Sequence, residues 1–210
     1  MIKLLIVDDH PIVRDGLKRL LDDSFHPILA DEASNGQEAI NKVWKNDYDL
    51  VLLDISMPGR DGLDVLKQIK SIKPNLSILV LSILPEELFG LRVLNAGASG
   101  YLSKTKSAEE LVEAIQKILS GERYISLSLA KKLSFSFENS IDPPAHKKLS
   151  DREFQVIRMI ASGKQVKEIA EEMCLSEKTI FKTRLNIKKK MEMKNNREII
   201  CYAISQGLVE

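Results

Sequence analysis

The stretch KLLIVDD at residues 3–9 contains an apolar run that ends abruptly in two acidic residues. The stretches LVLLD at 50–54 and ILVLS at 78–82 have the same form, with an apolar run that ends in one polar residue. A short apolar run without polar alternation indicates a strand that is buried on both faces. These three stretches therefore predict central strands of a parallel sheet.

Segments with helical spacing of apolar residues lie around these strands and predict an alternation of strands and helices. Weaker strand candidates at Pro27–Ala33 and Gly100–Leu102 bring the expected β-α units to five. The helical spacing is carried by Ile12, Val13, Leu17, Leu20 and Leu21, by Ala39, Ile40, Val43 and Trp44, by Leu63, Leu66 and Ile69, by Leu88, Leu91, Val93 and Leu94, and by Leu111, Ala114, Ile115 and Ile118. Such a sheet carries helices on both faces and binds ligands at the carboxyl ends of its strands.

The pattern from residue 149 onward is helical throughout. The sequence SDRE at 150–153 has the form of a capping box at the start of an apolar helix. Val166–Met173 and Ser176–Met191 follow as two helices joined by a short turn, with the small Ala170 where they cross. This arrangement predicts a helix-turn-helix, and NNRE at 195–198 begins a fourth helix.

Residues 121–148 separate these two patterns and form a predicted linker. Its serine-rich part, Ser126–Ser140, is expected to be partly helical, and Ile141–Pro144 should break regular structure. A chain of 210 residues is long enough for two domains of ordinary size. We predict an α/β fold, with a (βα)5 doubly wound parallel-sheet domain at 1–120 and an all-α four-helix domain at 149–210.

Composition and charge limit the classes of protein that the chain can belong to. The net charge of +1 hides 14 Lys and Arg against 18 Asp and Glu in residues 1–120, but 12 against 9 in residues 149–210. This asymmetry suggests different partners for the two ends, although the basic excess alone is a weak indication of nucleic acid. Cys174 and Cys201 lack CxxC spacing and are expected to be reduced thiols. No apolar stretch approaches the roughly 20 residues that span a bilayer, so we expect a soluble, cytoplasmic protein without membrane contact.

Polar side chains stand where the predicted strands end. Asp8 and Asp9 follow the first strand, Asp54 ends the third, Ser82 ends the fourth and Lys104 follows the fifth. Three carboxylates at one edge of a sheet repel one another unless a cation joins them, and oxygen ligands at a partly open site favour Mg²⁺. Each residue alone also fits an ordinary structural role, such as a turn former, a helix cap or a solvated charge. The coincidence of five such positions favours a phosphoryl-transfer site.

The motifs at both ends of the chain resemble those of a known family. Residues 8–11 (DDHP), 54–62 (DISMPGRDG), 81–82 (LS) and 100–104 (GYLSK) are similar to the receiver signature of two-component response regulators. Residues 149–153 (LSDRE), 169–172 (IAEE) and 175–180 (LSEKTI) resemble the helix-turn-helix of the NarL/FixJ, or LuxR-type, family. The resemblance covers both ends and leaves about 121–148 unmatched, and it implies the sheet order 2-1-3-4-5.

The resemblance implies that a sensor histidine kinase phosphorylates Asp54, which controls sequence-specific DNA binding and transcription by the C-terminal domain. It assigns Mg²⁺ to Asp8, Asp9, Asp54 and the backbone carbonyl of Ser56. Two further residues, Ser82 and Lys104, would contact the phosphoryl group. Tyr101 would be the switch aromatic that moves inward on activation, and the alternative is a half-buried core aromatic.

One departure from many relatives is the bulky Ile83, which directly follows the Ser82 hydroxyl. An apolar group beside the phosphorylation site should hinder an attacking water. We therefore predict a relatively long-lived acyl phosphate, with autodephosphorylation that speeds up in the Ile83→Ala variant.

Ser176–Met191 is the expected recognition helix, with Ile180, Ile187 and Met191 toward the core. The side chains expected to face DNA are Lys178, Thr179, Phe181, Lys182, Arg184, Leu185, Lys188 and Lys189. Phe181 and Leu185 are unusual on such a face. We consider that they contact thymine methyl groups or, alternatively, that they pack against the receiver or a partner subunit.

Symmetric half-sites and the weak contacts of a single module favour a homodimer. The sequence does not decide which surface forms the dimer interface. One candidate is the last helix, which offers Tyr202, and the other is the first and fifth helices of the N-terminal domain. A phosphatase of the aspartyl-phosphate kind is disfavoured because Asp8-Asp9 lacks DxD spacing, and we expect no enzyme activity beyond slow autodephosphorylation. The remaining alternative is a receiver-gated module that binds protein instead of DNA. A gel-shift titration against salt discriminates between the DNA-binding and the protein-binding function, because DNA binding should weaken steeply as salt rises.

Overall fold

The computed structural model describes residues 1–57, 62–126, 129–130 and 144–209. The chain divides into two compact units, Met1–Phe137 and Glu138–Glu210, each of which is described by itself. The helix predicted within 126–140 and the break predicted at 141–144 lie outside the described residues, apart from Ser126, Leu129, Ala130 and Pro144. Among the described helices, none has the length and apolar character needed to cross a lipid bilayer.

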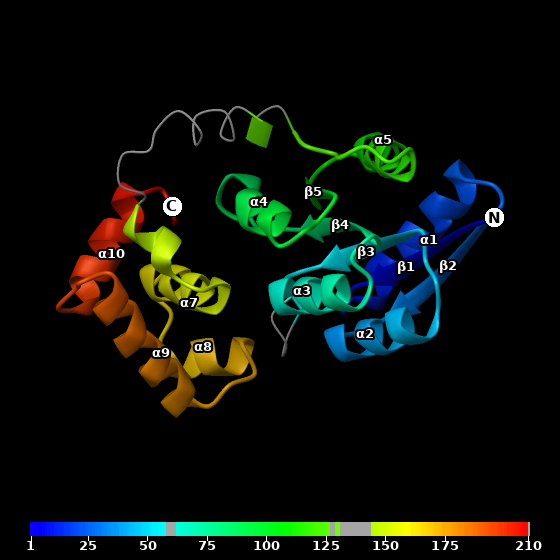
Figure 1. Cartoon of the computed structure of the whole chain (residues 1–210). Helices are drawn as coiled ribbons and strands as arrows, with labels where there is room; N and C mark the ends of the chain where they lie inside the picture. The colour runs from blue at the N-terminus through cyan, green and yellow to red at the C-terminus, as the bar shows by residue number, and fades with distance from the viewer. Residues whose placement is uncertain (58–61, 127–128, 131–143, 210) are drawn as a thin grey trace. The chain divides into compact units, whose positions relative to one another are not determined.

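The first unit is built on one parallel sheet in the order β2-β1-β3-β4-β5 (Figure 1). Its strands are β1 Ile2–Val7, β2 Ile28–Ala33, β3 Leu50–Asp54, β4 Ser77–Ser82 and β5 Gly100–Ser103. The strand β1 pairs with both β2 and β3, so the direction of winding reverses between β1 and β3. The five expected strands and the expected order are confirmed, and the carboxyl edge at this reversal is where such folds bind ligands.

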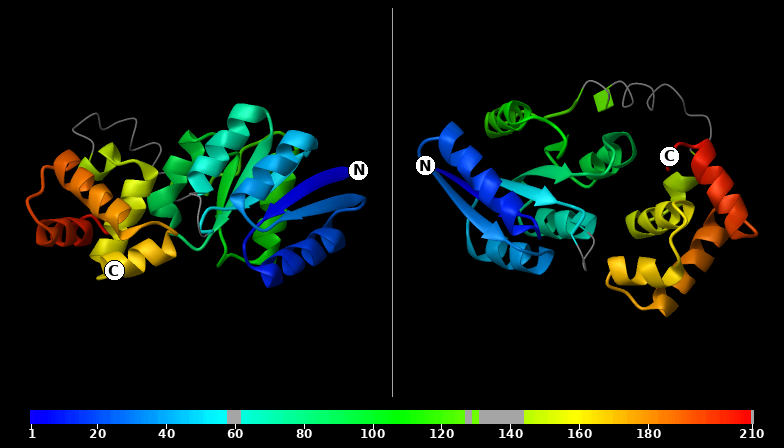
Figure 2. Two further views of the ribbon diagram at one scale, coloured as in Figure 1. Left: turned by 90° about the horizontal axis from the view of Figure 1, so that it is seen from below. Right: turned by 180° about the vertical axis from the view of Figure 1, so that it is seen from behind.

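Helices cover both faces of this sheet, because the crossovers between parallel strands are right-handed and the direction of winding reverses between β1 and β3. They are α1 Pro11–Ser24, α2 Gly36–Lys45, α3 Gly62–Ile72, α4 Glu86–Asn95 and α5 Ala108–Leu119. On one face, Leu21 of α1 and Ile115 of α5 pack with alternate strand residues such as Leu4, Leu52 and Leu79. The helices α2, α3 and α4 lie against the other face (Figure 2).

Three details of the predicted helical pattern were wrong. Ile12 and Trp44 are 85% and 72% exposed, because each is one residue, or about 100°, away from the stripe that faces the sheet. In α4 the fully buried aromatic is Phe89, which the pattern missed, whereas Leu88 is only half-buried. Leu88 and Phe89 are adjacent, so a short helix without strong periodicity does not decide between them.

In the second unit, the regular structure of residues 144–209 is helical and includes a short 3-10 helix, η1, at Ala145–Lys148. Its α-helices are α7 Asp151–Ala161, α8 Val166–Glu172, α9 Glu177–Lys190 and α10 Asn196–Ser205. The predicted capping box is confirmed, since the Ser150 side chain accepts from the Glu153 N–H and the Glu153 side chain accepts from the Ser150 N–H. The turn between α8 and α9 passes through Cys174 at φ 51°. Four helices with this turn confirm the predicted all-α fold.

Candidate functional site

The carboxyl ends of β1, β3 and β5 bring two carboxylates and a lysine together. Asp8 follows β1, Asp54 ends β3 and Lys104 follows β5. The Nζ of Lys104 lies 2.5 Å from Asp8 Oδ2 and 2.5 Å from Asp54 Oδ2. Both carboxylate side chains are buried, with 2% and 3% of their surface exposed. The parallel register produces this meeting, because it places Val7 of β1 beside Leu53 of β3.

Asp9 and His10 extend this cluster toward solvent. Ligand atoms of Asp8, Asp9 and His10 lie within 4.8 Å of one another. The Nδ1 of His10 lies 3.3 Å from Asp8 Oδ1 and 3.0 Å from Asp9 Oδ1. Asp9 Oδ1 is nevertheless buried and has no hydrogen bond of acceptable geometry within the described part of the chain. A buried carboxylate oxygen in this state is suited to a cation.

Burial and hydrogen bonding act in opposite directions on the pKa values of Asp54 and Lys104. Burial raises the pKa of Asp54 above its ordinary value, although the hydrogen bonds from Lys104 and from the Ser56 N–H act in the opposite direction. Burial alone would lower the pKa of Lys104, but its hydrogen bonds to Asp54 and Asp8 reverse this effect and raise the pKa. When Asp8, Asp9 and Asp54 are all ionised, their three carboxylates exceed the Lys104 ammonium by two charges, which matches a divalent cation.

A chain of hydrogen bonds leads from Asp54 to Tyr101. The N–H of Ser56 donates to Asp54 Oδ1 at 2.7 Å, and the Oγ atoms of Ser56 and Ser82 are 2.9 Å apart. The N–H of Leu84 donates to Ser82 Oγ at 3.1 Å, and the Tyr101 hydroxyl donates to the Leu84 carbonyl at 2.6 Å. Ser82 and Tyr101 are both completely buried, so Tyr101 faces inward and is not the half-buried aromatic of the alternative interpretation.

Sequence reasoning missed several groups that support the cluster. Nη1 of Arg14 donates to the Asp8 carbonyl at 2.8 Å, and its Nε donates to Glu32 Oε2 at 3.1 Å, which ties α1 to the ends of β1 and β2. The Ser56 hydroxyl and the Leu84 carbonyl were also missed. The role of Arg14 could have been predicted, because a basic residue in the first turn of the helix after Asp8 lies within reach of the end of that strand. A contact made by a backbone carbonyl cannot be predicted from residue types.

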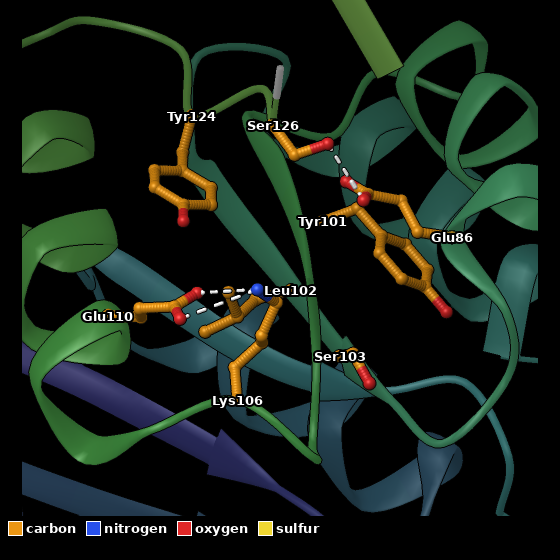
Figure 3. Close-up of a pocket in the computed structure, with 8 residues that line it drawn as sticks. All are labelled: Glu86, Tyr101, Leu102, Ser103, Lys106, Glu110, Tyr124 and Ser126. Atoms are coloured by element: carbon orange, nitrogen blue, oxygen red, sulfur yellow. Dashed lines mark hydrogen bonds and ion pairs between the residues drawn. The ribbon is translucent and has the colours of Figure 1, made fainter. Parts of the chain in front are cut away.

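A pocket with a volume of about 220 Å³ lies beside Tyr101 (Figure 3). Its lining residues are Glu86, Tyr101, Leu102, Ser103, Lys106, Glu110, Tyr124 and Ser126. Two polar contacts cross it: Lys106 Nζ lies 3.0 Å from Glu110 Oε2, and the Ser126 hydroxyl donates to Glu86 Oε2 at 2.8 Å. The pocket was not predicted from the sequence, because its walls come from α4, β5, α5 and the segment after α5.

The helix α9 separates an apolar side from a cationic side. Ile180, Ile187 and Met191 are buried, as predicted. The remaining expected contact residues are exposed or half-buried: Lys178, Thr179, Phe181, Lys182, Arg184, Leu185, Lys188 and Lys189. Ser176 caps the helix by accepting from the Thr179 N–H at 3.1 Å. The cationic side is therefore available to a partner, whereas the apolar stripe holds the helix in its unit.

A doubly wound sheet with acidic groups and a lysine at its switch point, in one chain with a helix-turn-helix unit, has the architecture of a two-component response regulator. Comparisons with known families agree with this class. Residues 4–116 match the response regulator receiver domain, and residues 147–203 match the bacterial regulatory proteins of the luxR family. The chain therefore belongs to the response regulators of the NarL/FixJ type, which pair a receiver with a LuxR-family domain.

Full-length relatives support the same assignment. The response regulator GacA of Pseudomonas syringae pv. syringae (strain B728a) is 34% identical over 211 residues, which cover 100% of this chain and 99% of the relative. The response regulator UvrY of Escherichia coli (strain K12) is 37% identical over 209 residues, which cover 99% of this chain and 96% of the relative.

Solved structures of RcsB have the same architecture. RcsB from Salmonella enterica serovar Typhimurium, bound to the promoter rprA in the presence of phosphomimetic BeF3⁻, gives a TM-score of 0.65 at 29% identity, over 98% of this chain and 100% of that one. A second RcsB–DNA complex gives a TM-score of 0.59 at 29% identity, over 97% of this chain and 98% of that one.

Proposed function

We propose that a sensor histidine kinase phosphorylates this regulator on Asp54 and that phosphorylation controls DNA binding by α9, and thereby transcription. In this proposal residues 1–120 receive the phosphoryl group, 121–148 connect, and 149–210 bind DNA. The observation that carries the proposal is the contact of the Lys104 ammonium with two buried carboxylates, Asp8 and Asp54, from separate strands. Buried charges are costly to assemble, so such a cluster is a strong indication of a functional site.

The donor set of the cluster suits Mg²⁺. Asp9 Oδ1 is buried without a hydrogen bond from the described residues, and the cluster is short of two positive charges when all its carboxylates are ionised. Asp8, Asp9, Asp54 and the backbone carbonyl of Ser56 would hold the ion. When bound, Mg²⁺ would screen the negative charge of an incoming phosphoryl group.

The residues of the chain divide the transfer chemistry among them. An Asp54 carboxylate oxygen attacks phosphorus in line, so a P–O bond forms as the P–N bond of the kinase phosphohistidine breaks and the electron pair stays on the leaving nitrogen. The Ser56 N–H already orients the Asp54 carboxylate through Oδ1. Lys104 would transfer its hydrogen bond from Asp54 Oδ2 to a phosphoryl oxygen, and Ser82 would donate to another.

The same contacts suggest how phosphorylation acts at a distance. A Ser82 hydroxyl that turns its proton toward a phosphoryl oxygen cannot donate to Ser56, and its rotation pulls on the Leu84 N–H that it accepts from. Leu84 also accepts from the Tyr101 hydroxyl at 2.6 Å, so the position of Tyr101 would follow. We therefore assign Tyr101 the role of the switch aromatic. It is fully buried in this structure, which is the inward position that the resemblance assigns to the activated state.

DNA binding is proposed for the exposed side of α9, with Lys178, Thr179, Phe181, Lys182, Arg184, Leu185, Lys188 and Lys189 as the contact residues. Lysine and arginine on one helix face neutralise phosphates, and the first turns of a recognition helix reach base edges. RcsB, which has the same two-unit architecture, has been solved in complex with DNA and as dimers on DNA. We propose double-stranded promoter DNA and a second copy of this chain as partners.

Phosphorylation is tested with acetyl phosphate and Mg²⁺ on full-length protein, with intact-mass spectrometry as the measurement. Wild type should gain one phosphoryl group, and Asp54→Ala should gain none. A matched control is Asp49→Ala, because Asp49 is a carboxylate next to β3 but accepts from the Lys3 N–H outside the cluster. Equal labelling of wild type and Asp54→Ala would contradict the proposal.

DNA binding is tested by genome-wide footprinting of wild type beside Asp54→Ala. We expect discrete promoter footprints that weaken or disappear in the variant. Footprints that are the same in both proteins would support DNA binding but contradict its control by Asp54. A complete lack of footprints, with binding to protein instead, would favour the alternative of a protein-interaction module.

A further inference from the structure

A pair of large apolar side chains stands on the exposed side of α9. Phe181 and Leu185 are four residues apart, and each is 48% exposed. The core side of the same helix is complete without them, since Ile180 and Ile187 are fully buried. Exposed aromatic and leucine side chains on one helix face are costly in water, which indicates that they contact a partner.

The surroundings of this pair indicate the chemistry of the partner. The cations around it are Lys178, Lys182, Arg184, Lys188 and Lys189, so the partner is expected to be strongly anionic. The guanidinium carbon of Arg184 lies 5.0 Å from the centroid of the Phe181 ring, which is a cation–π contact. This contact restrains both side chains before any partner arrives, so less conformational entropy is lost on binding.

We infer that Phe181 and Leu185 contact thymine methyl groups in the major groove and make α9 selective for thymine at one or two base pairs. The inference rests on the proposed DNA binding and adds the base that is recognised. The C5-methyl of thymine is the apolar group on the floor of the major groove, and the backbone on both sides supplies the negative charge that the five cations need.

Uracil provides a direct test, because it differs from thymine in a duplex only by the missing methyl. A randomised duplex pool is first selected with full-length wild type that has been treated with acetyl phosphate and Mg²⁺, and the selected site is then made with deoxyuridine at one thymine position at a time. Wild type should bind about fourfold more weakly at one or two positions, the effect of one buried methyl. Phe181→Ala or Leu185→Ala should remove this discrimination. The matched control, Lys182→Ala, should weaken all duplexes alike and keep it.

The outcomes separate this inference from the function on which it rests. If wild type selects a site but binds thymine and uracil versions equally, DNA binding stands and the thymine contact is wrong. If Phe181→Ala keeps the discrimination but changes the oligomeric state in light scattering, the pair serves a protein contact and the inference is also wrong. If the pool yields no selected site, the proposed DNA binding itself fails.

A second inference rests on the segment after α5, at residues 122–126 with Leu129 and Ala130. The Tyr124 N–H donates to the Ser99 carbonyl at 3.0 Å, and the Ser126 hydroxyl donates to Glu86 of α4 at 2.8 Å. Leu129 is 1% exposed. The segment is thus held on β5 and α4 by a backbone contact, a side-chain contact and a buried leucine.

Two glycines make room for this segment. A Cβ at Gly90 of α4 would lie 2.8 Å from Leu129 Cδ2, and a Cβ at Gly100 of β5 would lie 2.8 Å from the Tyr124 carbonyl oxygen. Both distances are shorter than van der Waals contact. The segment therefore docks where two separate elements lack side chains, and it lies beside Tyr101 in the wall of the same pocket (Figure 3).

We propose that this docked segment carries the state of Tyr101 into the linker. The hydrogen-bond chain from Asp54 ends at Tyr101 and Leu84, and Glu86 begins α4 only two residues after Leu84. A shift of the loop before α4 would move Glu86 and Gly90 against Ser126 and Leu129. The mechanism rests on the proposed phosphorylation of Asp54 and names the contacts that pass its effect onward.

The test compares the DNA affinity of full-length protein with and without acetyl phosphate and Mg²⁺. Gly90→Ala and Leu129→Ala should lower the ratio of phosphorylated to unphosphorylated affinity toward one, by about threefold or more, while phosphoryl uptake stays at the wild-type level. Gly16→Ala is the matched control, because a Cβ there meets nothing within 4 Å and also replaces a helical glycine. A wild-type ratio in both variants would overturn the mechanism. A ratio of one in wild type itself would instead show that phosphorylation does not control DNA affinity, and the docked segment would then have no signal to carry.

Discussion

Replacing Lys104 with methionine removes the ammonium that contacts both Asp8 and Asp54 and keeps most of the apolar volume of the side chain. Each carboxylate oxygen lies 2.5 Å from Nζ, so the two oxygens are separated by at most about 5 Å. At an effective dielectric constant of about 20, their repulsion is then ~3 kcal/mol, and in the wild type the attraction of the ammonium for both oxygens offsets it. Removal of one partner from a buried ion pair costs about 3–5 kcal/mol, and we expect the variant to lose about that much free energy of unfolding in the absence of metal.

Magnesium should reverse most of this loss, because it neutralises the same carboxylates. The Lys104→Met protein should also bind Mg²⁺ at least about tenfold more tightly than wild type, since the lysine no longer competes for the two carboxylates. It should nevertheless lose phosphoryl uptake. Loss of activity together with tighter metal binding is a combination that general misfolding does not produce.

Urea unfolding followed by tryptophan fluorescence measures this effect in the first unit alone, because Trp44 of α2 is the single tryptophan of the chain. The matched control is Lys106→Met, since Lys106 pairs with Glu110 outside the acidic cluster. Wild-type stability without metal, or Mg²⁺ binding that is weaker than in wild type, would refute the reasoning.

Three further predictions follow from the same structure. Asp54→Asn should raise the free energy of unfolding in the absence of metal by ~1–2 kcal/mol at neutral pH, because burial holds the pKa of Asp54 above its value in the unfolded chain. The stability of the wild type should fall as pH rises from the unfolded pKa of Asp54 to its folded pKa, and urea titrations across pH should show that the variant has lost this dependence. Glu153→Gln should destabilise the second unit by ~1 kcal/mol, because the amide can still accept in the cap of α7 but loses the ion pair with Lys190 Nζ, which lies 2.6 Å away. Since the pKa of Glu153 is lowered, this stabilisation should be present above pH ~4.5 and disappear as pH falls below it, as circular dichroism of thermal unfolding can show. Ile83→Ala should shorten the lifetime of the acyl phosphate several-fold, about the effect of opening one face of the site to water; Ile83 is 69% exposed beside Ser82, and an unchanged rate of phosphate release would remove the hypothesis.

Much of the fold was predictable because short segments of the sequence indicate their own secondary structure. Each of Val7, Leu53 and Leu81 ends an apolar run directly before a polar residue, and parallel pairing then requires these polar residues to meet at one edge. The order of the strands came from resemblance and not from the residues themselves. Phe89, by contrast, was missed because α4 is short and its apolar residues surround most of the helix.

The site was predictable only where a charged side chain directly follows an apolar strand. Asp8, Asp54 and Lys104 are conspicuous at strand ends, and their meeting follows from topology. The contacts between Ser82 and Tyr101 pass through the backbone of Leu84, which any residue except proline could supply. The docking of Leu129 depends on the absence of a side chain at Gly90, so its signal is a missing group on another element.

The coupling between Asp54 and the rest of the unit follows from the number of protons available. A serine hydroxyl has one proton to donate, and Ser82 is completely buried, so water cannot replace a contact that it gives up. In this structure its Oγ lies 2.9 Å from Ser56 Oγ and accepts from the Leu84 N–H. Either hydroxyl can be the donor in the contact between Ser82 and Ser56. If Ser82 donates to a phosphoryl oxygen, its proton is no longer available to Ser56, and the angle at which Ser82 accepts from Leu84 must change. A buried hydroxyl with a single proton therefore connects the charge at Asp54 to the loop before α4, whereas an exposed hydroxyl could exchange partners with water and transmit nothing.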